Sequence, residues 1–290
     1  MESSQSETLN SEKNKRHPGF IHYAPMLGFA LVIGGILLFI DQRLHTGWIP
    51  IALPVVAGLI ILAYGFYLRA DGWLNAGFIV TGVAGAIFLV FQPFVRFDDK
   101  HLVAYGLLFF SLSWMGLFLA NKLQAHKSHW WALFVILIAF ALAVVFYLGN
   151  MTVLVFTLAL SLAVGLSFLI WGMVTSKIGL QIPGLIISTV GVGVYNGWKS
   201  VGDVNGLRDT GVMLVWFSLG WLLITVFSRI FEKRFIWWPL IPGGILVMVG
   251  SGLYIGGNPS NATAFLQNTG SIALILLGVY LILLKFGLKK

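Results

Sequence analysis

The chain has 290 residues, of which 58% are hydrophobic and 10% are charged, and its mean hydropathy is +0.92. Soluble domains carry about a quarter charged residues, so this composition excludes an ordinary soluble domain. The net charge is +8 and there is no cysteine, which excludes disulfides, thiolate catalysis and cysteine-ligated metals.

In chain order, a polar tail comes before a long series of apolar runs. Residues 1–20 are polar and then basic, and we expect them to form a disordered cytoplasmic tail. The next apolar run has the length of a full span, so it is read as a retained helix and not as a signal peptide. We expect residues 21–290 to form a single transmembrane domain. The expected spans are 21–40, 48–68, 73–94, 102–121, 130–149, 151–173, 179–198, 211–230, 235–256 and 267–286.

These runs predict an all-α fold, because a helix of roughly 20 residues crosses ~30 Å of hydrocarbon. Between the fifth and sixth runs only Gly149 and Asn150 interrupt the apolar sequence. Joined, the two runs would be far too long for one span, so we expect a turn there. The sequence therefore predicts a polytopic transmembrane helical bundle of about ten spans, arranged in five hairpin-like units.

The basic residues predict the orientation of the spans. With the N-terminus in the cytoplasm, thirteen lysines and arginines fall on the inner side and five on the outer side, while the acidic residues divide equally. This asymmetry is the positive-inside pattern, and it places both termini in the cytoplasm. The membrane topology thus accounts for the excess of basic over acidic residues, and we expect no nucleic-acid partner.

Tryptophans mark the ends of the expected spans. Indole rings favour the headgroup layer of a bilayer, so we interpret these residues as interface anchors and not as a ligand cage. The predicted anchors are Trp48, Trp73, Trp130, Trp131, Trp198, Trp237 and Trp238.

Two internal matches accompany a glycine-rich composition. Residues 183–197 match residues 242–256 at an offset of 59, and Phe110 to Trp114 match Phe217 to Trp221 at an offset of 107. Both offsets favour a chain built from helical hairpins. Glycines let helix backbones approach closely in lipid, so the small-residue faces of the first match are predicted to pack helices. The predicted packing residues are Gly191, Gly193, Gly197, Gly250, Gly252 and Gly256.

The sequence offers no constellation that predicts catalysis. Transporters and pumps usually keep ionisable residues inside the membrane, yet every charged residue falls at an end of an expected span or in a loop. His126 and His129 have a spacing that suits a metal, but no third ligand is near, and a solvated loop is favoured over zinc. Hydroxyl residues within the spans are expected to bond mostly to their own helix backbone. We therefore predict no enzyme, no catalytic or metal site and no cofactor.

The stretch from Leu27 to Asp41, followed by Trp48-Ile-Pro50, resembles the two-helix unit of LiaI/LiaF-type bacterial membrane proteins. In that unit a glycine-spaced helix ends near an acidic residue and the next helix opens on Trp-Pro, as Trp237-Trp238-Pro239 does again. The hairpins are also similar to those of HdeD-type acid-resistance proteins, for example from Gly72-Trp73 to Gln92-Pro93. The resemblance implies a non-enzymatic role in sensing, regulating or resisting envelope stress, or in scaffolding, in the bacterial cytoplasmic membrane.

Two other functions stay open. Ten helices in a chain of this length, with both ends inside, are similar to the drug/metabolite transporters, and a neutral or amphipathic solute would need no buried charge. An accessory subunit of a larger membrane complex is the second alternative. In that case the small-residue faces would contact other membrane proteins as well as the lipid bilayer.

Overall fold

The computed structural model describes residues 24–44, 47–92, 99–124, 129–198, 206–231, 233, 235–257, 274, 275 and 278. Within these residues the chain is helical and has no strand, so the prediction of an all-α fold is confirmed. The expected tail, 1–20, lies outside the described residues, and so does most of the tenth expected span, 267–286.

The described residues form helices at each of the first nine expected spans, with ends that differ by a few residues. Their bounds are α2 Ala24–Leu44, α3 Ile49–Leu68, α4 Asp71–Phe91, α5 Asp99–Gln124, α6 Ala132–Leu148, α7 Val153–Val174, α8 Ile178–Trp198, α9 Gly206–Phe231 and α10 Leu240–Gly257. A turn separates α6 from α7, where Gly149 caps α6 with a positive φ of 68°.

Within the described residues, seven helices are long and apolar enough to cross a membrane. They are α3, α4, the part of α5 from His101 to Leu123, α7, α8, α9 and α10. Helix α6 is equally apolar but has 17 residues, which is short for ~30 Å of hydrocarbon. These are the helices of a multi-pass membrane protein.

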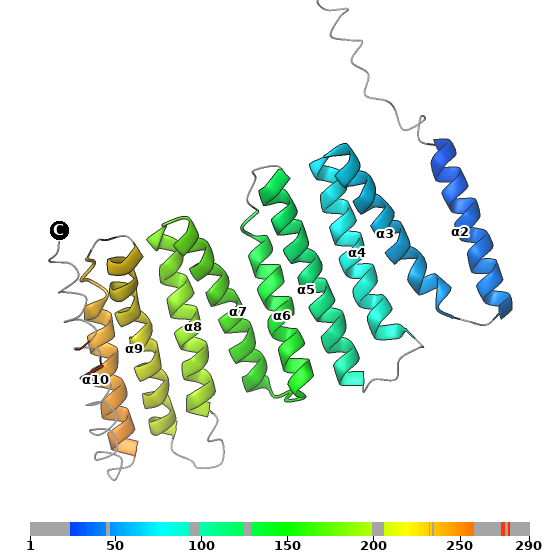
Figure 1. Cartoon of the computed structure of the whole chain (residues 1–290). Coiled ribbons are helices and arrows are strands. Elements are labelled where there is room, and N and C mark those ends of the chain that lie inside the picture. The colour runs from blue at the N-terminus through cyan, green and yellow to red at the C-terminus, as the bar shows by residue number, and fades with distance from the viewer. Residues whose placement is uncertain are drawn as a thin grey trace, which may run out of the picture.

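The helices stand side by side in a single row, in the order of the chain (Figure 1). Within the described residues each helix packs against its neighbours in sequence, and the expected bundle therefore takes the form of a row. Contacts are most extensive in the pairs α3–α4, α7–α8 and α9–α10, weaker between α6 and α7, and slight between α2 and α3. Because no hydrophobic drive brings helices together in lipid, nothing forces such a row to close on itself.

The row repeats itself at an interval of 107 residues. Helices α4 and α8 begin at residues 71 and 178 and both have 21 residues, while α5 and α9 begin at residues 99 and 206 and both have 26. The turns repeat too, because Arg69 and Ser176 occupy equivalent places with positive φ angles of 50° and 52°. We name α3–α6 the first unit and α7–α10 the second unit. The interval therefore relates four consecutive helices, which is twice the length of a hairpin.

Glycines hold the first two helices of each unit together at equivalent positions. A Cβ on Gly58 would lie 2.6 Å from Thr81 Oγ1, and one on Gly65 would lie 2.7 Å from the backbone nitrogen of Leu74. The equivalent contacts in the second unit are Gly165 with Ser188 and Gly172 with Gln181. Such distances leave no room for a side chain, so backbone approach is what packs α3 on α4 and α7 on α8.

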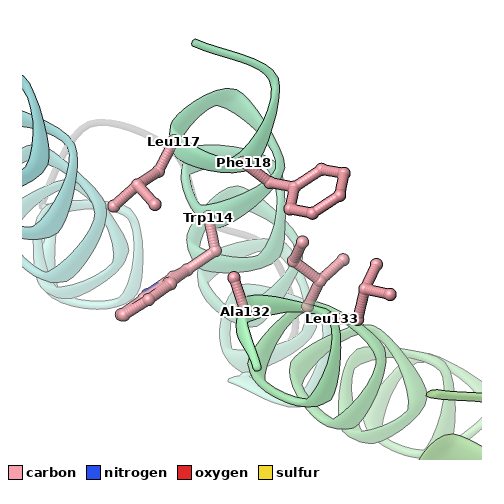
Figure 2. Packing of buried hydrophobic residues seen from close by; sticks show 6 residues of the cluster. Trp114, Leu117, Phe118, Ala132 and Leu133 are labelled. Atoms are coloured by element: carbon pink, nitrogen blue, oxygen red, sulfur yellow. The ribbon is translucent and has the colours of Figure 1, made fainter. Parts of the chain in front are cut away.

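The contact between α5 and α6 is made by larger side chains. Trp114, Leu117 and Phe118 of α5 and Ala132 and Leu133 of α6 belong to one buried cluster, in which Leu117 is directed towards the neighbouring cyan helices (Figure 2). Trp114 also meets Trp131 edge to face at 5.3 Å between ring centroids, and the equivalent pair Trp221–Trp238 has the same arrangement at 5.7 Å. The arrangement of these tryptophan pairs is therefore repeated after 107 residues, as the helix bounds are.

Candidate functional site

An apolar cleft lies between α3 and α4 and has a volume of about 520 Å³. Its walls carry only proline, isoleucine, valine and alanine side chains. The lining residues are Pro50, Ile51 and Pro54 from α3 and Ile79, Val80, Val83, Ala84 and Ile87 from α4. Pockets of roughly 300–1,000 Å³ are the size in which proteins bind small molecules, so we take this cleft as the candidate functional site.

The cleft is open because of residues at the start of α3. Pro54 lies inside the helix, where it has no N–H to donate and its ring crowds the preceding turn. On the other side of the cleft, α4 presents Ala84, which is 7% exposed. Closer to the other end of the pair, Gly58 and Gly65 bring α3 against α4. The two helices therefore make close glycine contacts next to the cleft that Pro50, Ile51 and Pro54 line.

One rim of the cleft is formed by Ile79, Val83 and Ile87. These residues are four apart, so they share one face of α4, and they are 39%, 44% and 47% exposed. The same face therefore belongs both to the cleft and to the outer surface of the row. With no donor, acceptor or charge among its side chains, this arrangement can hold an apolar chain or ring but has no group for acid–base chemistry.

The glycines predicted to pack helices fall into two groups. Gly191 meets Ser161 of α7, Gly193 and Gly197 meet Met213 of α9, and Gly250 meets the backbone of Gly211. In contrast, a Cβ on Gly252 or Gly256 would have no atom within 4 Å among the described residues. These two glycines lie on α10, the last helix of the described row.

The predicted interface anchors all lie at helix ends. Trp48 caps the start of α3, Trp73 lies in the first turn of α4, and Trp198 ends α8. The remaining four come in pairs that precede α6 and α10: Trp130, Trp131, Trp237 and Trp238. Their position is the one expected of anchors, and their role in a bilayer stays a prediction.

Two buried amide side chains, those of Asn121 and Gln181, are not singled out by the sequence. Asn121 of α5 is 2% exposed and donates from Nδ2 to Oδ1 of Asn75 on α4 at 2.7 Å. Gln181 is 1% exposed and donates from Nε2 to the Gly172 carbonyl at 3.3 Å, while its Oε1 has no partner. A polar residue placed among apolar ones at a helix-packing position is the signal that would have found them.

Most hydroxyl groups inside the helices bond to their own backbone, as expected. Two that do not are Ser111, which donates to the Ile136 carbonyl of α6 at 2.9 Å, and Ser113, which donates to the Phe78 carbonyl of α4 at 2.7 Å. The Thr81 and Thr225 hydroxyls are buried without a hydrogen-bond partner. Side-chain bonds between helices thus add to the glycine contacts in the first unit.

Groups that could bind a metal are not brought together in the described part of the chain, where no three His, Asp or Glu side chains converge. His129 precedes α6, and His126 lies outside the described residues.

Comparison of the chain with protein-family models, curated proteins and solved structures gave no match.

Proposed function

We propose that this chain is a non-enzymatic membrane scaffold, which holds another membrane protein against its row of helices. It would span the bacterial cytoplasmic membrane ten times with both termini in the cytoplasm. Support for that topology comes from the thirteen-to-five division of basic residues and from the tenth apolar run. The resemblance to LiaI/LiaF-type and HdeD-type hairpins supports a place in the response to envelope stress.

The observation that carries this proposal is the single row. Because the described helices pack against their neighbours in sequence, each presents two further sides to its surroundings. Helix α2 exposes apolar side chains on opposite sides, since Phe29 and Leu31 are 72% and 68% exposed and lie on opposite faces of it. An open row gives other helices a long surface to lie against, whereas a carrier encloses its path between helices.

A transporter of a neutral or amphipathic solute is the second candidate, and one observation favours it. The cleft between α3 and α4 is apolar and has the volume of a small-molecule site. It opens on the side of the row and does not run between several helices. The cleft therefore supports binding better than passage across a membrane.

Extraction of the full chain from its native membrane into polymer-bounded lipid discs tests the scaffold. We expect one other membrane protein at a fixed ratio to the chain. The chain has no cysteine, so Val32→Cys on exposed α2 and the buried Ala132→Cys give unique, matched cross-linking positions. The partner should cross-link to the first variant and not to the second. Recovery of the chain alone, together with solute uptake by liposomes that contain only this chain, would favour the transporter instead.

A further inference from the structure

The cleft belongs to the first unit, and its counterpart in the second unit is closed. At the interval of 107 residues, Pro54 corresponds to Ser161 and Ala84 corresponds to Gly191. A Cβ placed on Gly191 would overlap the Ser161 hydroxyl, so α7 and α8 are in close contact at the positions that line the cleft between α3 and α4. The rest of the two helix pairs is held by equivalent glycine contacts. Six of the eight lining positions differ between the two units, and the differences at Pro54 and Ala84 are the ones at which the second unit makes a close contact.

The cleft is continuous with the surface that apolar helices present to lipid. Its rim residues Ile79, Val83 and Ile87 are partly exposed, and Val56 and Leu59 extend the exposed apolar surface of α3. Helices α3 and α4 are both long and apolar enough to cross a membrane. Hydrocarbon is therefore the medium into which the cleft opens, and a hydrocarbon chain can enter it from the side without losing any hydrogen bond.

We propose that this cleft binds one acyl chain of a bilayer phospholipid. The walls offer apolar contact along the chain and no group that would bind a headgroup. The cleft begins at Pro50, two residues after Trp48, and tryptophan favours the headgroup layer. A lipid whose chain lies along Pro50 and Pro54 would therefore keep its headgroup at the membrane interface. This assignment is independent of the scaffold role.

Helix α2 is the competing occupant, since it precedes α3 and is largely exposed. Its contact with α3 is slight, and none of its residues lines the cleft. Phe39 at the end of α2 remains 60% exposed. The described helices therefore leave the cleft open to lipid.

The experiment measures phospholipid retained by the purified full chain. The protein is delipidated in detergent, titrated with dioleoyl phosphatidylglycerol, and analysed by native mass spectrometry. We expect one tightly held lipid on the unaltered chain. The double variant P54S/A84G gives the first unit the residues of the second at the two positions of the Ser161–Gly191 contact, and we expect it to weaken lipid binding at least tenfold. The reciprocal variant S161P/G191A should gain a second tightly held lipid.

Two further single substitutions on α4 serve as a test of cleft filling and as its control. Ala84→Leu should fill the cleft without changing the backbone and should also weaken lipid binding tenfold or more. Ala76→Gly makes the same kind of change as A84G at an exposed position on α4, and it should bind lipid like the unaltered chain. Equal lipid retention by the unaltered chain and by A84L would overturn the proposal. A high-yield disulfide between Phe39→Cys and Val83→Cys would overturn it too, because α2 would then fill the cleft.

Discussion

The helix pairs α3–α4 and α7–α8 share three glycine contacts and differ at a fourth position. Gly58, Gly65 and Gly77 of the first pair correspond to Gly165, Gly172 and Gly184 of the second, and each approaches the neighbouring helix closely. Beyond these contacts the first pair has the cleft that Pro54 and Ala84 line, while the second pair is in close contact through Ser161 and Gly191. The two pairs therefore share the glycine contacts that pack their helices and differ in the residues around the cleft.

The largest effect is expected from side chains added at the shared contacts. In Gly65→Ala or Gly172→Ala, the new Cβ would meet backbone atoms of the next helix, so we expect a loss of about 1–3 kcal/mol in the free energy of unfolding. Denaturation by dodecyl sulfate in mixed micelles measures it. The control Gly34→Ala adds a methyl group where no atom lies within 4 Å, and its stability should be unchanged or higher by up to ~1 kcal/mol. An equal loss in all three variants would contradict the close-approach account.

An exchange of Leu74 and Gln181 tests the difference in polarity at one equivalent position. Both residues pack against a glycine of the preceding helix, but the Oε1 of Gln181 has no partner. We expect Leu74→Gln to lower the free energy of unfolding by about 1–3 kcal/mol, because it buries an unsatisfied amide oxygen. Gln181→Leu should be neutral or stabilising. If Q181L proves as destabilising as L74Q, the amide of Gln181 has a partner in the membrane.

The amide pair between Asn75 and Asn121 belongs to the first unit, where the second has Ile182 and Ser228 at the equivalent positions. Hydrogen bonds between transmembrane helices contribute about 0.6–2 kcal/mol, so we expect a coupling of about 1 kcal/mol. A double-mutant cycle of Asn75→Ala and Asn121→Ala in the same unfolding assay gives the coupling. Additive single effects would show that the bond contributes nothing to stability.

The smallest effect is expected at Ser111 and Ser218, which occupy equivalent positions on α5 and α9. Ser111 donates to the Ile136 carbonyl of the next helix, whereas Ser218 donates to the Val215 carbonyl of its own helix. We expect Ser111→Ala to cost about 0.6 kcal/mol and Ser218→Ala to leave stability nearly unchanged. Equal costs would remove this distinction between the units.

Hydropathy predicts the helices because apolar length is a property of the sequence alone. The repeat was visible in sequence only where large side chains are shared, as in Phe110 to Trp114 and Phe217 to Trp221. At one contact between the second and third helices of each unit, the small residue lies on the opposite helix. Gly82 of α4 meets Ser113 of α5, while at the equivalent contact Thr189 of α8 meets Gly220 of α9. When the glycine and the hydroxyl residue exchange places between the two helices, the contact is kept, but neither position shows the same residue at the offset of 107.

The cleft could be anticipated only in part. Pro54 in the second expected span indicates a disturbed helix. The opposing Ala84 has no distinctive pattern, and its meaning comes from its place across from Pro54 and from the contrast with Gly191. The row itself could not be predicted either, because small-residue faces show that helices approach but not which partners they choose.

Distance measurements across the two equivalent pairs test the open cleft most directly. The chain has no cysteine, so spin labels at Ile51→Cys and Ile87→Cys report on α3–α4, and labels at Leu158→Cys and Val194→Cys report on α7–α8. Double electron–electron resonance on the full chain in lipid bilayers then compares the two. The account predicts a longer mean distance across α3–α4, which shortens to the α7–α8 value in the P54S/A84G background. Equal distances in the unaltered chain would contradict it.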